Sequence, residues 1–201
     1  MITAIILAAG ASERMGRPKA LLPFQGGTFL ETTVAKSRAA GVDSCVVVLG
    51  PDAGKIIESI DLSDATVVRN DEPASGPIGS IRLAIDALNR SVDAVLVWHV
   101  DRAHVAVATL AKLLDRFMEG GAAVVLPVHA GRRGHPVIFG REVFDELREA
   151  PDAEGARAVV RADPSRVALV PVEDRAVLED IDTPEAYADL LRRIDAADTN
   201  P

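Results

Sequence analysis

The chain has 201 residues with a formal net charge of −8, and 48% of its residues are hydrophobic although only 3% are aromatic. This length predicts one domain with a core of Ala, Val, Leu and Ile. The acidic balance argues against a nucleic-acid partner, and the absence of any apolar run of roughly 18 residues argues against a membrane partner. The one cysteine, Cys45, can form no intrachain disulfide, and the amino terminus lacks the basic region of a signal peptide. These features predict a cytoplasmic protein.

The first element in the chain is the short apolar run 2–7, which predicts a buried β-strand. Small and then basic residues follow it: Ala8, Ala9, Gly10, Arg14, Arg17 and Lys19. Small residues let backbone N–H groups approach an anion, and basic side chains add charge for a phosphate chain. Gly10 and Gly16 lie six positions apart, which fits neither a dinucleotide fingerprint nor a Walker loop. The segment predicts a triphosphate site, and an ordinary glycine-rich turn stays open as the alternative.

Strand-like and helix-like segments alternate through the next hundred residues. Helices are predicted at 29–40, 52–60, 75–88 and 105–118, and strands at 44–49, 65–68, 94–100 and 122–127. Thr28 is expected to cap the first of these helices and Gly41 to end it. This alternation is typical of a parallel sheet with right-handed crossovers.

The carboxyl half is less regular. It predicts a turn at 129–134, strands at 136–139, 167–172 and 176–178, and helices at 141–150, 154–162 and 184–194. The predicted fold class is α/β, a three-layer αβα Rossmann-like arrangement whose mostly parallel twisted sheet has a small antiparallel addition in the C-terminal half. We expect one domain over 1–194, with a nucleotide-binding half at 1–128 and an acceptor-side half at 129–194. The polar tail 195–201 is expected to fray.

Acidic residues suited to Mg²⁺ occur in two places. Asp101 directly follows the strand 94–100 and should face the crevice above the sheet, where oxygen ligands and substrate phosphates can share a metal ion. Asp180 and Asp182 lie two apart, so both would face one side of an extended stretch. The alternatives are helix capping for Asp101 and stabilisation of a helix dipole for the later pair.

Two further segments predict ligand contacts. The basic pair and histidine in 132–137, with Arg133 and His135, could bind an anionic acceptor group, although a solvated hairpin remains the alternative. Asn70, Gly76 and Ser80 lie after a strand and at a helix start, where backbone groups and the helix amino terminus could read a nucleotide base. A plain loop and helix cap is the alternative.

Several of these segments resemble one family. The stretch 7–19, LAAGASERMGRPK, resembles the signature L-A-[AG]-G-x-S-x-R-M-G-x-P-K of MobA-like nucleotidyltransferases, which relate to molybdenum cofactor biosynthesis and have the nucleotide-diphospho-sugar transferase fold. The later strings R-G-H-P-V and D-I-D-T-P-E also resemble members of this family, the first of them its cytidylyltransferase branch. One difference is that Ala103 stands where many members carry a proline after the aspartate corresponding to Asp101.

The resemblance implies roles for individual residues. The implied nucleotide-binding set is Leu7, Ala8, Ala9, Gly10, Arg14, Lys19, Asn70, Gly76 and Ser80. Arg14, Lys19 and Asp101 are the implied catalytic residues. Magnesium is implied on Asp101 and Asp182, with Asp180 as a further ligand, while Arg133 and His135 face the acceptor.

The implied reaction is transfer of CMP from CTP to the phosphate of the molybdenum cofactor, with Mg²⁺ bound and pyrophosphate released. The L-A-A-G motif at 7–10 favours CTP, because this form of the motif accompanies cytidine preference in the family. The implied partners are CTP, molybdopterin as acceptor, and a molybdenum hydroxylase that receives the product. Two alternatives remain: another phosphate acceptor such as a sugar 1-phosphate, and a non-catalytic protein that binds or delivers a nucleotide or the cofactor.

Overall fold

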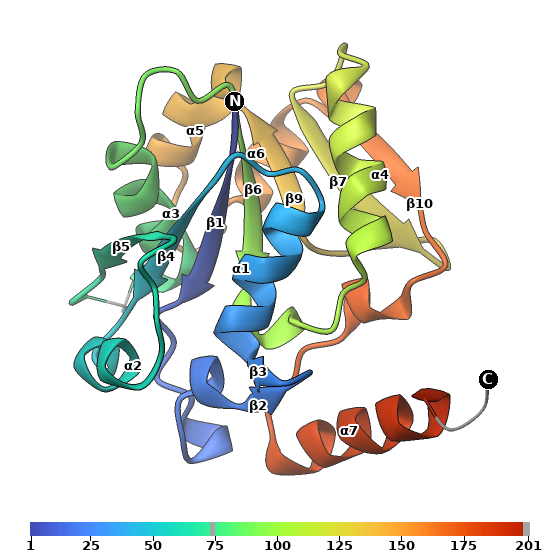
Figure 1. Cartoon of the computed structure of the whole chain (residues 1–201). Helices are drawn as coiled ribbons and strands as arrows, with labels where there is room; N and C mark the ends of the chain where they lie inside the picture. Colours follow the sequence, from blue (N-terminus) through green and yellow to red (C-terminus); the bar gives the residue numbers. More distant parts are fainter. Residues whose placement is uncertain (73–74, 199–201) are drawn as a thin grey trace.

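The computed structural model describes residues 1–72 and 75–198, which are organised around one twisted sheet (Figure 1). The strands of this sheet are β1 (Ile2–Ala8), β4 (Ser44–Leu49), β5 (Thr66–Arg69), β6 (Ala94–His99), β7 (Val124–His129), β8 (Arg132–Arg133), β9 (Val137–Gly140) and β10 (Val167–Pro171). Seven of them lie in the order β10–β7–β9–β6–β1–β4–β5, and β8 pairs with the last residues of β7. A separate short hairpin consists of β2 (Pro23–Phe24) and β3 (Gly27–Thr28).

The sheet is mostly parallel. Strand β1 pairs in parallel with β4 and β6, β4 with β5, and β7 with β10. Strand β9 is antiparallel to both neighbours, β6 and β7, and β8 is antiparallel to β7. The predicted α/β class with an antiparallel addition in the C-terminal half is therefore confirmed. The register of β1 against β6 places Leu7 opposite His99, so both strands end at the same edge of the sheet.

Helices cover both faces of the sheet, giving the three layers expected (Figure 1). They are α1 (Phe29–Ala39), α2 (Ala53–Ser59), α3 (Gly76–Asp86), α4 (Val107–Met118), α5 (Phe144–Glu149), α6 (Arg157–Ala162) and α7 (Pro184–Asp198). One buried cluster joins α1, α2, α4 and α7 to one face, and the other joins α3, α5 and α6 to the opposite face. Consecutive residues of β1 divide between the two clusters, because strand side chains alternate from face to face.

Local signals explain several helix boundaries. The hydroxyl of Thr28 accepts from the backbone N–H of Glu31, whose carboxylate in turn accepts from the N–H of Thr28, a complete capping box. Gly41 follows the helix with φ at +97°, a conformation that suits glycine. The hydroxyl of Thr183 caps α7 by accepting from Ala186 at 3.2 Å. The cap predicted at Thr28 is therefore confirmed.

Two predictions for the carboxyl half were wrong. The segment 176–178 forms a 3₁₀ turn, η7 (Arg175–Leu178), because Asp174 accepts the backbone N–H of Ala176 and so starts a tight turn instead of a strand. Helix α7 runs to Asp198 instead of ending at 194, so part of the expected frayed tail is helical. The rest of that tail, 199–201, lies outside the described residues.

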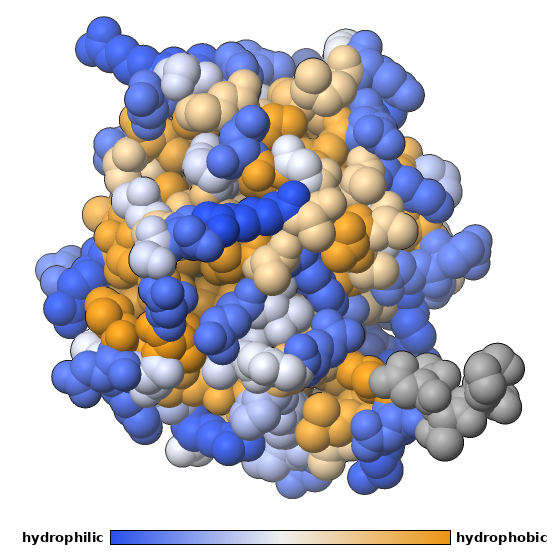
Figure 2. Space-filling model, viewed as in Figure 1, coloured by the Kyte–Doolittle hydropathy of each residue, from blue (hydrophilic) through white to orange (hydrophobic). Residues whose placement is uncertain are grey.

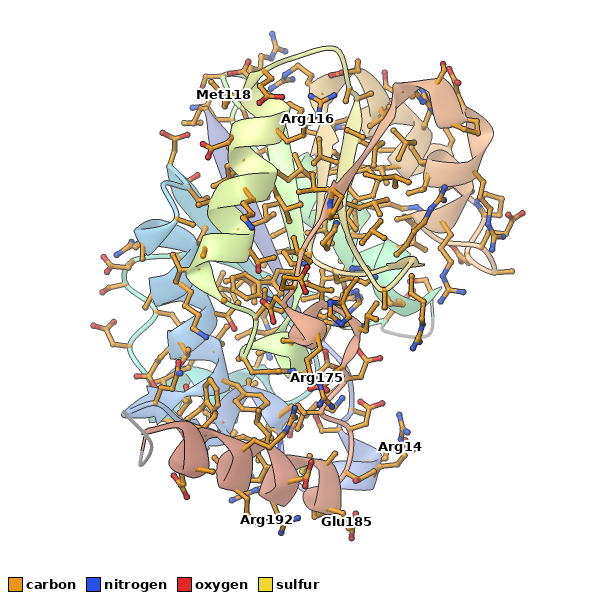
Figure 3. All side chains as sticks on the ribbon, turned by 90° about the vertical axis from the view of Figure 1, so that its right-hand side faces the viewer. Arg14, Arg116, Met118, Arg175, Glu185 and Arg192 are labelled. Atoms are coloured by element: carbon orange, nitrogen blue, oxygen red, sulfur yellow. The ribbon has the colours of Figure 1, made fainter. Side chains whose placement is uncertain are left out.

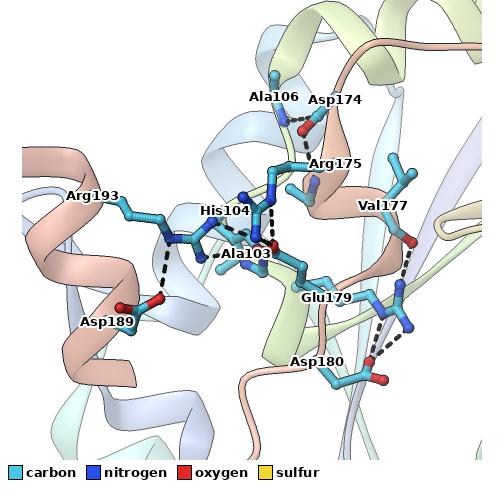
Figure 4. A network of polar contacts seen from close by, with 12 residues as sticks. Ala103, His104, Ala106, Asp174, Arg175, Val177, Glu179, Asp180, Asp189 and Arg193 are labelled. Atoms are coloured by element: carbon cyan, nitrogen blue, oxygen red, sulfur yellow. Dashed lines mark hydrogen bonds and ion pairs between the residues drawn. The ribbon is translucent and has the colours of Figure 1, made fainter. Parts of the chain in front are cut away.

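Helix α7 and the turn η7 are tied to the loop after β6 by a polar network (Figure 4). The carboxylate of Glu179 accepts from Arg175 at 2.6 Å and from Arg193 of α7 at 2.9 Å. His104 lies beneath this group with its side chain 5% exposed, and its Nε2 is 3.5 Å from Glu179. Burial lowers the pKa of His104 to about 4, so the imidazole is neutral near neutral pH.

The surface mixes residue types. On the face drawn in Figure 2, hydrophobic residues reach the surface among hydrophilic ones. In residues 1–72 and 75–198, none of the helices combines the length and apolar character that crossing a bilayer requires.

The buried imidazole of His104 predicts acid sensitivity. Below pH 6.5 the unfolded chain takes up a proton at this site, while the folded chain resists until about pH 4. We therefore expect the free energy of unfolding to fall between pH 6.5 and 4 by up to about 3 kcal/mol more in the wild type than in His104→Gln. Urea unfolding at a series of pH values measures this difference. Parallel curves for the two proteins would contradict it.

Candidate nucleotide-binding site

A cleft lies where β1 and β6 end and α3 begins, as expected for an open α/β sheet. Its cavity volume is about 190 Å³. Eight of the predicted site residues line it: Leu7, Ala8, Ala9, Gly10, Lys19, Gly76, Ser80 and Asp101. Sequence reasoning did not single out other lining residues, among them Gly50, Pro51 and Asp52, while Ser12 and His99 line the cleft beside the predicted residues. The sheet thus brings most of the predicted nucleotide-binding residues to one place.

The loop after β1 has a fixed backbone. Ser12 adopts a left-handed conformation with φ at +53°, and its hydroxyl accepts from the backbone N–H of Lys19 at 3.1 Å. Met15 in the middle of the loop is buried in the core. A Cβ on Gly50 would lie 2.3 Å from the carbonyl oxygen of Ala9, so only glycine lets the end of β4 approach the loop this closely. These contacts hold the loop open toward the cleft.

Lys19 joins two of the predicted metal ligands. Its ammonium donates to Asp101 at 2.9 Å and also to Asp182. The three side chains are only 15%, 18% and 26% exposed, respectively. Burial alone would lower the pKa of Lys19, but the two carboxylates outweigh it and raise the pKa above its usual value. A cation therefore already lies between Asp101 and Asp182.

Arg14 approaches the same group from solvent. Its guanidinium donates to the second oxygen of Asp182 at 2.6 Å, and its side chain is 71% exposed. Burial would raise the pKa of Asp182, but Lys19 and Arg14 hold it below its usual value. Arg14 lies at the same end of the molecule as Glu185 of α7, away from Met118 at the far end of α4 (Figure 3).

Asp101 has spare capacity to accept a ligand. Its Oδ1 is buried and accepts no hydrogen bond from any residue that the structure describes. In the same part of the chain, no three or more His, Cys, Asp or Glu side chains gather into a group that could hold a metal. Mg²⁺ needs fewer, because one or two carboxylates, substrate phosphates and water can complete its shell. Asp101 and Asp182 therefore fit a magnesium ion that is shared with a substrate.

The structure places Asp180 differently from Asp182. Its Oδ1 accepts from Nε and Nη2 of Arg102, at 2.8 and 2.7 Å. Arg102 is buried, and its Nη1 donates to the carbonyl oxygen of Val177. The role of Asp180 as a metal ligand stays a prediction, and its carboxylate is already paired with Arg102. Sequence reasoning missed Arg102, and its position directly after Asp101 was the available signal.

Asn70 lies behind the cleft and does not line it. Its side-chain amide donates to the hydroxyl of Ser80 at 2.9 Å, and its Oδ1 accepts from Glu72. A Cβ on Gly79 would lie 1.9 Å from the hydroxyl of Ser75, which shows how tightly the first turn of α3 is packed. Asn70 therefore supports the start of α3, whose lining residues Gly76 and Ser80 face the cleft.

The two predicted acceptor residues have different surroundings. The ring of His135 meets the ring of His99 edge to face, with centroids 5.0 Å apart, and His99 lines the cleft. Burial lowers the pKa of both imidazoles, that of His135 to about 3, so both are neutral near neutral pH. Arg133 is exposed on β8, which pairs with β7. The structure thus places His135 next to the cleft and Arg133 on the hairpin surface.

Comparison with known proteins agrees with this geometry. The sequence model of the MobA-like NTP transferase domain matches residues 4–167. Nicotine blue oxidoreductase of Paenarthrobacter nicotinovorans is 32% identical, over 94% of this chain and 96% of its own. Molybdenum cofactor cytidylyltransferase of Escherichia coli K12 is 27% identical, over 92% of this chain and 93% of its own.

A solved structure also matches over nearly the whole chain. The crystal structure of Rv0371c from Mycobacterium tuberculosis H37Rv superimposes with a TM-score of 0.84 and 31% identity, covering 95% of this chain and 97% of that one. The same protein crystallised as a complex with manganese gives a TM-score of 0.81 and 30% identity, covering 95% of this chain and 98% of that one.

The Arg102–Asp180 pair predicts an uneven loss of stability. Arg102→Met removes one of the two donors to the carbonyl oxygen of Val177 and leaves Asp180 without its counterion, so we expect the free energy of unfolding to fall by about 3 kcal/mol. Asp180→Asn should cost about 1 kcal/mol, because the carboxylate is 49% exposed. The double variant should lose less than the sum, because the two side chains interact.

Urea unfolding of the two single variants and the double variant tests this. Arg192→Met is the matched control, because its ion pair with Asp189 is exposed on both sides, and its change should stay within about 0.5 kcal/mol. Strict additivity of the Arg102 and Asp180 variants would show that the two side chains are not coupled.

Proposed function

Because the chain belongs to the MobA-like NTP transferase family, we propose that it transfers CMP from CTP to the terminal phosphate of the molybdenum cofactor and releases pyrophosphate. The family match confirms the resemblance in the sequence and makes the chain a MobA-like nucleotidyltransferase; the nucleotide and the acceptor are the proposal. One observation carries it above all. Lys19 and Asp101 line the cleft where the strands end, and Lys19 also contacts Asp182, which Arg14 contacts from the solvent side.

The chemistry that this arrangement suits is displacement at phosphorus. An oxygen of the acceptor phosphate attacks the α-phosphorus, and the bond from that phosphorus to the bridging oxygen of the β-phosphate breaks. The attacking oxygen is already deprotonated, so no side chain needs to act as a general base. Catalysis then consists of positioning and charge neutralisation. In this proposal Lys19 and Arg14 bind the β- and γ-phosphates and stabilise the leaving pyrophosphate.

A divalent ion has a place in this scheme. Asp101 and Asp182 would hold Mg²⁺, and a bound ion would draw negative charge from the α-phosphate and the incoming oxygen. The buried, unpartnered oxygen of Asp101 supports this role. The crystal structure of the mycobacterial relative with manganese supports a divalent ion in the family.

The choice of base and acceptor rests on other residues. The backbone of 7–10 and the first turn of α3 line the cleft and are placed to contact the nucleotide. We propose CTP as the nucleotide substrate because of the L-A-A-G motif around Ala9. The 27% identity to the molybdenum cofactor cytidylyltransferase of Escherichia coli supports the same choice. We propose that His135 and Arg133 contact the acceptor. The ring of His135 packs against His99, which lines the cleft.

A second candidate function is oxidation and reduction. It is favoured by 32% identity over almost the full length of nicotine blue oxidoreductase. Such an activity would need a soluble electron carrier, and a nicotinamide dinucleotide has the phosphates and bases that a nucleotide cleft can bind. Consumption of reduced nicotinamide cofactor with nicotine blue as acceptor, without pyrophosphate release from CTP, would favour it. Transfer to a sugar 1-phosphate and a binding or delivery role stay open beside it.

Nucleotide binding is the first expectation. We expect CTP with Mg²⁺ to raise the unfolding temperature more than GTP, ATP or UTP does. At 100 times the dissociation constant a ligand adds about 2.7 kcal/mol, which is roughly 5–10 °C for a chain of this length. The shift should shrink without Mg²⁺ and in Asp101→Asn. If no nucleotide shifts the transition, nucleotidyl transfer is excluded. A shift without pyrophosphate release, when molybdenum cofactor is supplied, favours a binding protein.

Lys19 is expected to matter for turnover. Lys19→Ala should lower pyrophosphate release at least about 100-fold, the scale of losing one preorganised charge contact. Lys112→Ala, an exposed change on α4, is the control and should leave the rate unchanged. Near-normal turnover by Lys19→Ala would remove Lys19 from the catalytic group.

A further inference from the structure

The two roles of Lys19 conflict. Its ammonium contacts both carboxylates of the proposed metal site, Asp101 and Asp182. The proposed function requires the same ammonium to bind the triphosphate, and the same two carboxylates to bind a divalent ion. A metal ion and an ammonium cannot occupy one position between two carboxylates. The arrangement in the free protein is therefore a different state from the one that would bind substrate.

The second internal cation in this region is Arg102, which we expect to keep its position. This side chain is buried. It contacts the carboxylate of Asp180 through two nitrogens and donates a third hydrogen bond to the carbonyl oxygen of Val177. A planar guanidinium fork of this kind is held in one geometry. Lys19 is a point charge on a flexible stem, and its backbone N–H is fixed by Ser12. The Lys19 side chain can therefore move while the loop remains in place.

We propose that Lys19 is an exchangeable counterion, which holds Asp101 and Asp182 in the free protein and is displaced from them when a divalent ion binds. The displaced ammonium then lies at the mouth of the cleft, free to bind the phosphates of the nucleotide. This last step rests on the proposed function. Metal and nucleotide consequently strengthen each other's binding, because each removes the partner that Lys19 would otherwise hold.

Charge supports the exchange. Without ligands, the carboxylates of Asp101, Asp180 and Asp182 are matched by the cations of Arg14, Lys19 and Arg102. A divalent ion alone would leave this group with excess positive charge. A triphosphate alone would leave it with excess negative charge. With both ligands bound and Lys19 moved to the phosphates, the excess negative charge is smaller than with the triphosphate alone.

Lysine labelling followed by mass spectrometry tests the proposal directly. The ammonium of Lys19 is protected in the free protein by two carboxylates and by burial. Saturating Mn²⁺ alone should raise the acylation rate of Lys19 several-fold, and adding CTP should lower it again. Lys36 is the internal control, because it donates to the carbonyl oxygens of Ala103 and Val105 and should not respond.

Mn²⁺ binding to the free protein, followed by electron paramagnetic resonance, is the second measurement. Lys19→Met removes the competing ammonium and should tighten Mn²⁺ binding about tenfold, the scale of two partly exposed ion pairs. Arg14→Met is the matched control, because it removes the same charge from Asp182 without freeing the position between the carboxylates. An equal gain in both variants would show a general field effect and overturn the exchange.

The outcomes separate this proposal from the proposed function. If CTP binds and pyrophosphate is released while Mn²⁺ leaves the labelling of Lys19 unchanged, the exchange is wrong and the function stands. If Mn²⁺ exposes Lys19 but no nucleotide protects it, the exchange at the carboxylates stands and nucleotidyl transfer is wrong. If Mn²⁺ binds Lys19→Met no better than the wild type, Lys19 is no competitor and the exchange is excluded.

Discussion

Three carboxylates gathered at one edge of the sheet are the constraint on which the site depends. Asp101, Asp180 and Asp182 would repel one another if each had only water as a partner, and each is instead paired with a cation of the chain. The molecule as a whole is strongly acidic, so these local cations are what would let a phosphate chain approach. Adding a triphosphate alone would leave excess negative charge at this place, which a metal ion bound with it would reduce.

The fold brings these charges together from distant parts of the chain. The parallel register of β1 and β6 ends both strands at one edge, which places the loop containing Lys19 beside Asp101. The segment before α7 returns to the same edge, where the backbone N–H of Ile181 donates to the carbonyl oxygen of Asp101 at 3.1 Å. Asp182 follows directly. The Lys19–Asp182 contact therefore depends on sheet register and on the return of the last segment.

The sequence predicted what is local and missed what is not. Apolar β-branched runs identified β1, β4 and β6, and the Thr28–Glu31 spacing identified the start of α1. The loop from Gly10 to Lys19 and the aspartate after β6 identified the cleft. The Arg102–Asp180 pair joins residues 78 positions apart, and no local pattern reveals that Arg102 reaches it. The antiparallel place of β9 between β6 and β7 is equally a property of the whole sheet.

Arg102 also links the two sides of the cleft. The carbonyl oxygen of Val177 accepts from Arg102 and, at 2.9 Å, from the backbone N–H of His135. A Cβ on Gly134 would lie 2.5 Å from the same oxygen, so the hairpin before β9 packs directly on η7. One carbonyl thus connects the residue after Asp101 to the segment that carries the proposed acceptor contact. In the proposed exchange only Lys19 moves and Arg102 keeps its three bonds, so the acceptor side would keep its position while charge is rearranged on the nucleotide side. This division would let the site exchange a metal ion and a triphosphate without disturbing the position of the acceptor.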